Sequence, residues 1–377
     1  MNDITLRSIA LLVSAVSLCH AQTVPVSDSM TLDEIGRAME AYPPRWEFGD
    51  QRAAITASLD KHITVQIQKG WTILSKRQLK PVHEFYLKRM DIGLDKLERT
   101  RVTSGVHAFK FYSSSYVFKT AQGTVAVEFS QGPINNGGEP ETRDEYGSGF
   151  YWRPDQRERL AKLVDVYLIT HRHHDHSDYS LARSMTAAGK PMICPAQLKT
   201  IWKDFADKLT VPEYGKVQKL GPVEIFTMLG SQMSRNEPTG IGTERRGVPN
   251  PENPERDSET ICYLFKLAGI TFITCGENHV PAVEWLKQGI AQGFKPNVCM
   301  SLGQFQGDRA MSAALKTMKP LFRLPLHEYE MMHGGGGNRT GPLMQGRNRA
   351  AFDKHQVMPL LWGEDFLITD DAVAFTR

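Results

Sequence analysis

The chain has 377 residues, enough to bury a large hydrophobic core in one large domain or two smaller ones. It carries 45 Lys and Arg against 42 Asp and Glu, a formal net charge of +3. This near balance argues against a nucleic-acid-binding protein that uses a dominant basic face. No nucleic-acid partner is expected.

The first 21 residues have the pattern of a secretory signal peptide. Arg7 ends a short charged region, an apolar stretch runs from Ser8 to Leu18, and small residues precede a predicted cleavage site after Ala21. The apolar stretch is too short to span a bilayer. We expect an exported protein, periplasmic or secreted, with no stable membrane insertion.

Residues 22–103 are predicted to form an N-terminal helical extension of a main domain that covers residues 104–377. After Pro81, which is expected to open a helix, apolar residues recur at helical spacing; they are Val82, Tyr86, Met90, Leu94 and Leu97. Such a stripe is typical of a helix face packed on a core. The extension is expected to act as a lid or a dimer element, which makes a homo-oligomer one expected assembly.

Short strands begin near Gly105; they are predicted at His107–Tyr112, Tyr116–Thr120 and Thr124–Phe129. A Gly-, Pro- and acid-rich loop follows from Ser130 to Trp152. Its aromatic residues Phe150-Tyr151-Trp152 are expected either to line a substrate site or, as the favoured reading, to anchor the loop. A helix is predicted at Pro154–Leu163.

The segment from Asp165 to His176 is the most informative part of the sequence. Asp165–Thr170 is an apolar run typical of a buried strand, and four histidines and an aspartate follow it within six residues. His171 and His173 point to the same side of an extended chain, and a turn would bring Asp175 and His176 into the same space. Imidazole and carboxylate groups suit zinc-like ions, so the segment predicts a metal site.

Helices and strands alternate after this segment, which favours an α/β architecture. The predicted elements are helices at 179–188, 196–208, 281–292 and 310–318, and strands at 192–194, 217–220, 223–229, 298–302 and 321–326. A long loop is predicted at 230–259. Two strands around Ala268-Gly269 form a predicted hairpin that places Cys262 opposite Cys275. Free buried thiols are the default expectation, and a cross-strand disulfide is the alternative.

His171-Arg172-His173-His174-Asp175-His176 resembles the HxHxDH signature of the metallo-β-lactamase superfamily. The resemblance covers about Gly105 to Asp370. It implies an αββα sandwich fold and metal-dependent hydrolysis. Within the superfamily the sequence is most similar to the lactonase and phosphodiesterase branch, which includes ascorbate-6-phosphate lactonase.

The resemblance also implies further ligands at two strand ends. Gly276-Glu277 stands where the family usually has Gly-Asp, whose carboxylate bridges two metals, and His327 matches the last histidine. Glu277 and His327 would join Asp175 and His176 in one site. The implied cofactor is zinc, as two ions, with manganese or iron as alternatives.

The sequence departs from the family at the first metal. The loop after the strand predicted at 223–229 reads Gly230-Ser231-Gln232-Met233-Ser234 and lacks the expected histidine. His279 is the preferred substitute, and His107 or His333 are alternatives. If none of them substitutes, the first position binds metal weakly and the protein works with one tightly held ion.

A glycine-rich segment, His333 to Thr340, follows His327 closely. Its backbone N–H groups together with Arg339 are expected to bind an anionic part of the substrate, or the segment is simply a surface loop.

The expected chemistry is hydrolysis of an ester-like bond in a lactone, a phosphodiester or a related small molecule. A metal lowers the pKa of bound water toward neutrality and creates a hydroxide nucleophile, which Asp175 would help to orient. The alternative is a non-catalytic or single-metal binding or sensory protein on the same fold. A redox role on iron is a third possibility.

Overall fold

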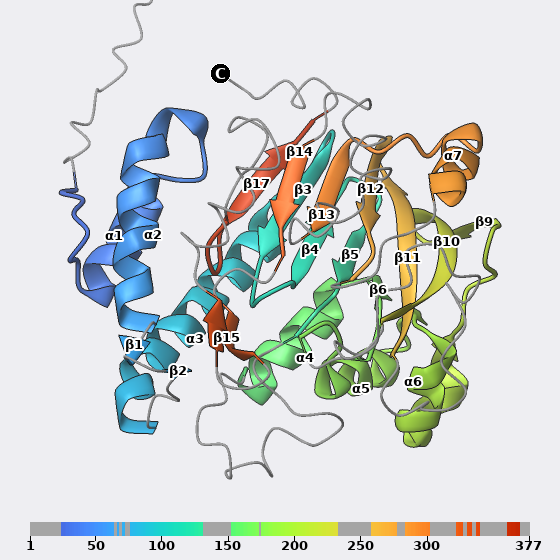
Figure 1. Ribbon diagram of the computed structural model, residues 1–377, viewed down its shortest axis with the longest axis horizontal. Coiled ribbons are helices and arrows are strands. Elements are labelled where there is room, and N and C mark those ends of the chain that lie inside the picture. Colours follow the sequence, from blue (N-terminus) through green and yellow to red (C-terminus); the bar gives the residue numbers. More distant parts are fainter. Residues whose placement is uncertain are drawn as a thin grey trace, which may run out of the picture.

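The fold consists of two β-sheets packed face to face between layers of helices (Figure 1). The computed structural model describes residues 24–63, 66–67, 70–71, 76–130, 152–172, 175–232, 258–276, 283–301, 322–326, 330–333, 337–339 and 360–369. This helix–sheet–sheet–helix order confirms the predicted αββα sandwich. The helix predicted at 310–318 lies outside the described residues.

The first sheet has seven strands in the order β17-β3-β4-β5-β6-β7-β8. Their bounds are Val106–Lys110 (β3), Tyr116–Lys119 (β4), Thr124–Val127 (β5), Val166–Leu168 (β6), Met192–Ile193 (β7), Leu209–Thr210 (β8) and Asp365–Ile368 (β17). β3, β4 and β5 form an antiparallel meander, and β5 to β8 run parallel. The meander and the strand before the histidine motif were both predicted from the sequence, and both are confirmed.

The second sheet has six strands in the order β14-β13-β12-β11-β10-β9. Their bounds are Val217–Leu220 (β9), Val223–Gln232 (β10), Ser258–Leu267 (β11), Ile270–Thr274 (β12), Val298–Ser301 (β13) and Phe322–Pro325 (β14). The predicted hairpin register is confirmed, because Phe265 lies opposite Phe272. Ala268 and Gly269 at its turn both have positive φ, 47° and 86°, as a two-residue type I′ turn requires.

The inner faces of the two sheets share one hydrophobic core. Aliphatic and aromatic side chains alternate along the strands so that one set from each sheet meets the other. Phe118 of the first sheet packs on Phe272 of the second with ring centroids 4.7 Å apart, and Phe272 stacks on Phe265 at the same separation. This core holds the ends of strands from both sheets at fixed positions.

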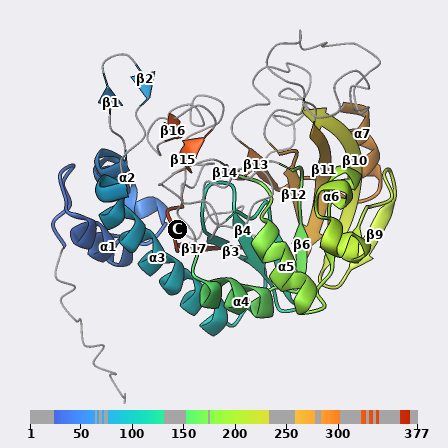
Figure 2. The same cartoon turned by 90° about the horizontal axis from the view of Figure 1, so that it is seen from below.

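Helices cover the outer faces of both sheets (Figure 2). The bounds are Leu32–Ala41 (α1), Gly49–Ile63 (α2), Lys76–Arg99 (α3), Pro154–Leu163 (α4), Tyr179–Ala187 (α5), Ala196–Ile201 (α6) and Val283–Ala291 (α7). α1 to α5 share a core with the outer face of the seven-stranded sheet, and α7 packs on the six-stranded sheet. Two small pairs complete the described strands: Gln66–Ile67 (β1) with Gly70–Trp71 (β2), and Glu330–His333 (β15) with Gly337–Arg339 (β16).

α3 begins earlier than the sequence indicated. Pro81 was expected to open this helix, but the helix starts at Lys76 and contains Pro81. Proline removes one backbone hydrogen bond, yet its φ is helical, so a turn can precede it.

A buried ion pair and a buried hydrogen bond join the N-terminal helices to the C-terminal segment. Arg52 of α2 donates two hydrogen bonds to the Glu364 carboxylate, at 2.7 and 2.6 Å, and both side chains are almost fully buried. Arg89 of α3 donates to the Trp362 carbonyl oxygen at 2.9 Å. The boundary predicted at residue 103 therefore separates stretches of sequence that share one core.

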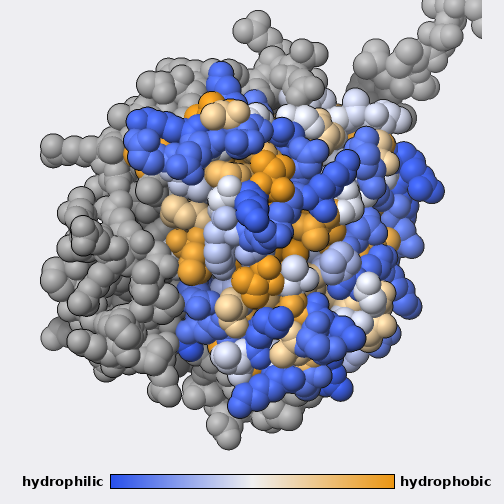
Figure 3. Space-filling model, turned by 90° about the vertical axis from the view of Figure 1, so that its right-hand side faces the viewer, coloured by the Kyte–Doolittle hydropathy of each residue, from blue (hydrophilic) through white to orange (hydrophobic). Residues whose placement is uncertain are grey.

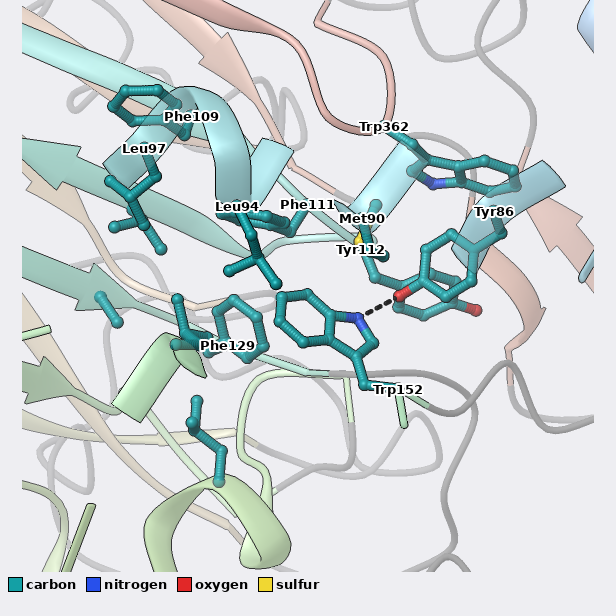
Figure 4. Packing of buried hydrophobic residues seen from close by; sticks show 14 of the residues in the cluster. Tyr86, Met90, Leu94, Leu97, Phe109, Phe111, Tyr112, Phe129, Trp152 and Trp362 are labelled. Carbon is teal, nitrogen blue, oxygen red and sulfur yellow. Dashed lines mark hydrogen bonds between the residues drawn. The ribbon is translucent and has the colours of Figure 1, made fainter. Parts of the chain in front are cut away.

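Aromatic side chains fill the space between α3 and the seven-stranded sheet (Figure 4). Trp152 lies in this cluster between Phe111 and Phe129, and its indole N–H donates to the Tyr86 hydroxyl at 2.7 Å. Trp152 thus anchors the chain before α4, as the favoured reading predicted. Phe150 and Tyr151 lie outside the described residues.

Replacing Tyr86 by Phe should lower the free energy of unfolding by about 1–3 kcal/mol, because the buried Trp152 N–H loses its acceptor. Chemical denaturation measures the change. Tyr42→Phe is the control, since Tyr42 is half-buried and donates to the Val24 carbonyl oxygen; we expect a smaller loss. Equal losses in the two variants would contradict the role given to the buried pair.

One face of the described surface carries both hydrophilic and hydrophobic residues. Figure 3 shows the side on which α6, α7 and β9 lie, with hydrophobic residues in small areas among hydrophilic ones. Among the described residues, the exposed large hydrophobic side chains are Ile201, Val217 and Leu367. No helix within the described ranges combines the length and apolarity needed to cross a membrane.

Candidate metal centre

Strand ends from both sheets meet at one edge of the sandwich. Glu128 follows β5, Thr170 and His171 follow β6, and Thr274 ends β12. Thr274 donates a hydrogen bond across the sheets to the Glu128 carboxylate. The N–H of Ile261 on β11 donates to the Thr170 carbonyl oxygen at 2.8 Å. The predicted metal motif therefore leaves β6 at a point fixed by the second sheet.

Three of the predicted metal ligands lie together at this edge. His171, Asp175 and His176 are each at most 1% exposed. The imidazole rings of His171 and His176 lie with centroids 4.1 Å apart, and His176 Nε2 is 3.4 Å from Asp175 Oδ2. The turn after β6 thus brings the two halves of the motif into one space, as the sequence predicted.

Glu128 belongs to the same cluster and was missed by the sequence analysis. Its side chain is fully buried, and Oε2 lies 2.5 Å from His176 Nδ1. The backbone of Glu128 has φ 51°, a left-handed conformation that non-glycine residues rarely adopt outside functional or strained sites. A signal was present in the sequence, because an acidic residue directly follows the apolar strand at 124–127.

The contact with Glu128 orients the His176 ring. In the neutral form of the ring, a carboxylate on Nδ1 keeps the proton on that nitrogen, and Nε2 would be the nitrogen that ligates an ion. Burial lowers the pKa of His176, but the carboxylates of Asp175 and Glu128 outweigh it and hold this pKa well above its ordinary value. Neutral imidazole is the form that binds metal, so an ion bound at this position would displace a proton from His176.

Gly276 allows the second sheet to approach the motif closely. It has φ 62°, and a Cβ atom at this position would lie 2.8 Å from His171 Nδ1 and 3.1 Å from Thr170 Oγ1. Only glycine fits both the conformation and the space. The predicted Gly-Glu pair therefore begins with a residue that sets the position of His171.

Several predicted site residues cannot be placed with these three. His173, Glu277, His279 and His327 lie outside the described residues. Arg339 and His333 are described only as backbone, in β16 and β15. Their roles at the site stay predictions.

His107 does not lie at the metal centre, so its proposed substitution for the missing ligand is wrong. Its Nε2 lies 2.8 Å from Asp365 Oδ2, and its ring stacks on Phe109. Val106 and Ala108 point into the core between the sheets, so the alternation of the strand turns His107 to the opposite face.

β10 continues farther than predicted, through Gln232, and Ser231 lies opposite Glu259 of β11. The start of the long loop was therefore predicted too early, since cross-strand pairing with β11 extends the strand past Gly230. Ser231 and Gln232, which were predicted to begin the loop, are strand residues paired with Glu259 and Ser258.

The residues present fit a zinc-like ion. Such ions prefer imidazole and carboxylate ligands, and the site has two imidazoles and a carboxylate, all buried. Glu128 holds one of the imidazoles, that of His176, in place. Within the described ranges no group of three His, Cys, Asp or Glu side chains is close enough to hold an ion unaided. The remaining predicted donors lie outside those ranges.

The described cysteines are buried free thiols, as the default expectation had it. Cys275 precedes Gly276, and its thiol is hydrogen-bonded with Cys262 from the neighbouring strand. Burial and this neighbour raise the pKa of Cys275 well above its ordinary value. Cys262 and Cys275 therefore lie side by side, as the hairpin register predicted, but they do not form a disulfide.

Two features decide the fold. The sheets form a two-layer sandwich with helices outside, and the HxHxDH segment leaves an inner strand at the edge where ends from both sheets meet. The fold is metallo-β-lactamase-like.

Comparison with known proteins found similar chains among solved structures only. No family model matches the chain, and no curated protein matches it. Among solved structures, a possible metal-dependent hydrolase from Veillonella parvula is 14% identical, with 70% of this chain and 100% of that chain covered and a TM-score of 0.47. An isothiocyanate hydrolase from Delia radicum gut bacteria is 12% identical, with 70% and 99% covered and a TM-score of 0.46.

The metallo-β-lactamase fold protein YhfI from Bacillus subtilis is 10% identical, with 70% of this chain and 99% of that chain covered and a TM-score of 0.40. Likenesses at this level assign no substrate.

Proposed function

We propose that the chain is a metal-dependent hydrolase that cleaves an ester-like bond in a small molecule. The observation that carries the proposal is the buried group of His171, Asp175 and His176 at the end of β6, braced by Glu128. Burying two imidazoles beside two carboxylates costs free energy unless the groups serve one another or an ion. A bound metal ion would offset the cost of burying these groups together.

The chain's own residues have distinct parts in this proposal. His171, Asp175 and His176 would hold the ion together with the predicted ligands His173, Glu277 and His327. Glu128 orients His176, and Gly276 lets the second sheet lie against His171. The ion would supply Lewis acidity and lower the pKa of water toward neutrality. Asp175 would also help to orient the attacking water.

The substrate class follows from the predicted branch. A lactone or a phosphodiester has the electrophilic centre that this chemistry requires, and both are ester-like. Zinc is the proposed metal because most of the predicted ligands are imidazole nitrogens. Manganese and iron are the alternatives, since carboxylates suit manganese and imidazoles also suit iron. The predicted signal peptide, residues 1–21, supports placing the activity outside the cytoplasm.

Metal removal should abolish turnover and lower the thermal stability of the protein. An ion that binds the folded state at 100 times its Kd stabilises the protein by about 2.7 kcal/mol, and a chelator removes this contribution. The experiment is a panel of lactones, phosphodiesters and β-lactams, assayed before and after chelation, with thermal unfolding in parallel. Zinc added back should restore both quantities. Turnover that survives chelation would refute a metal-dependent reaction.

The second candidate is a protein that binds one metal without catalysis. The sequence favours it, because Ser231 and Gln232 are weak ligand types where the resemblance predicts a further histidine. One ion per chain and no turnover on the panel would select this candidate. Two ions with chelator-sensitive turnover would select the hydrolase.

A further inference from the structure

A tight turn beside the metal centre has polar groups that its own folding does not require. The turn joins β3 to β4 and is closed by a hydrogen bond from Ser115 N–H to the Tyr112 carbonyl oxygen, 2.7 Å long. Ser113 and Ser114 are its two central residues. Ser113, Ser114 and Ser115 are all fully buried.

The two central serines break local rules. Ser113 has φ 49° at a turn position where glycine is the unstrained choice. The hydroxyls of Ser113 and Ser114 are buried, and neither has a hydrogen-bond partner among the residues that the structure describes. Glycine at 113 would relieve the backbone strain, and alanine at 114 would remove a buried hydroxyl that has no described partner. Backbone strain and unpaired buried polar groups that do not stabilise the local structure are typical of functional sites.

A buried cation lies against the same turn. Lys110, the last residue of β3, is fully buried, and its ammonium donates to the Ser113 carbonyl oxygen. The ammonium also lies 4.2 Å from the centroid of the Tyr116 ring. An ammonium only donates hydrogen bonds and a serine hydroxyl can donate one, so all three groups can serve an anionic oxygen.

The turn is connected on both sides to the metal centre. Ser115 Oγ accepts a hydrogen bond from Ser130 N–H at 2.7 Å, and Ser130 is two residues after Glu128. Tyr116 donates from its hydroxyl to the Pro325 carbonyl oxygen at 2.8 Å, two residues before the predicted ligand His327. Lys110 and the serines therefore lie at the strand-end edge that carries the metal motif.

We propose that Lys110, Ser113 and Ser114 bind a carboxylate or phosphate group of the substrate. The inference rests on the proposed function for the identity of the bound molecule, but the anion site itself can be tested without turnover. It makes the substrate an anionic ester: one end is held at the turn while the scissile bond lies at the metal centre. Two sources of the anionic oxygen, carboxylate and phosphate, share this chemistry.

The test is calorimetric titration of the purified protein with inorganic phosphate and, separately, with succinate. Ser113→Gly and Ser114→Ala should each weaken binding by about tenfold or more while leaving the unfolding temperature equal or higher, since each relieves a local cost. Lys110→Met should weaken binding most. The tighter of the two ligands identifies the anionic group.

Two controls separate the possible outcomes. Thr227→Val removes another buried hydroxyl without a described partner, on β10, and should leave anion binding unchanged. His176→Ala should retain binding at the turn, because the metal ligands are not part of the anion site. The proposal is overturned if the wild-type protein binds neither anion, or if Ser113→Gly and Ser114→Ala bind as tightly as wild type. It is also overturned if binding is lost only with His176→Ala, which would place the anion on the metal.

Discussion

Gly276→Ala should reduce metal affinity and activity by about 100-fold or more. The added Cβ would lie 2.8 Å from His171 Nδ1, closer than real Cβ contacts, and 3.1 Å from Thr170 Oγ1, which is tighter than most of them. His171 is fully buried and cannot withdraw into solvent, so its imidazole must shift by several tenths of an ångström. Metal–ligand distances tolerate shifts of only about 0.2 Å, so the displaced ring binds an ion poorly. Metal titration and kcat/KM measure the loss.

Gly189→Ala is the matched control for this substitution. Gly189 has nearly the same backbone conformation, φ 67° against 62°, but no atom lies within 4 Å of an added Cβ. It should lose about 1 kcal/mol of stability from backbone strain and keep its metal affinity. If both variants lost only stability, the contact between Gly276 and His171 would have no part in metal binding.

Glu128→Gln should lower metal affinity about 10–100-fold with little change in fold. The amide keeps the size of the side chain but removes the negative charge that holds His176 Nδ1 at 2.5 Å. Partners that orient a ligating histidine typically contribute this much to metal affinity or activity. The measurement is zinc titration followed by kcat/KM, with circular dichroism to confirm folding.

Glu259→Gln serves as the comparison for Glu128→Gln. Glu259 is also a carboxylate at the strand-end edge, but it accepts a hydrogen bond from the Gln197 N–H at 2.7 Å instead of contacting the motif. Removing the negative charge of Glu259 should leave zinc affinity unchanged. Wild-type zinc affinity in Glu128→Gln would show that His176 needs no carboxylate to orient it.

The layers of the fold were predictable because their signals are local. Apolar runs at 165–170 and 223–229 mark buried strands, and Ala268-Gly269 supplies the turn that sets the register of Phe265 against Phe272. The histidine motif was equally visible, since its donors follow one strand within six residues. In each case the pattern of neighbouring residues in the sequence was sufficient to predict the feature.

The residues that support the motif were not predictable in the same way. Glu128 contacts His176, which is 48 residues later, and Thr274, which is 146 residues later, so its role depends on how the two sheets pack. His107 was a possible ligand by residue type, but its strand face directs it to Asp365. Ser113 and Ser114 look like ordinary turn residues until their burial and the positive φ of Ser113 are known. Tertiary packing decides all of these positions.

Metal content is the most direct measure of the central claim, that the end of β6 is a metal centre. The measurement is elemental mass spectrometry of wild-type protein and of His176→Ala, both purified with zinc present and then dialysed. We expect at least one ion per chain in the wild-type protein and a loss of most of it in His176→Ala. A wild-type protein without metal, or a His176→Ala variant that retains the full amount, would contradict the account.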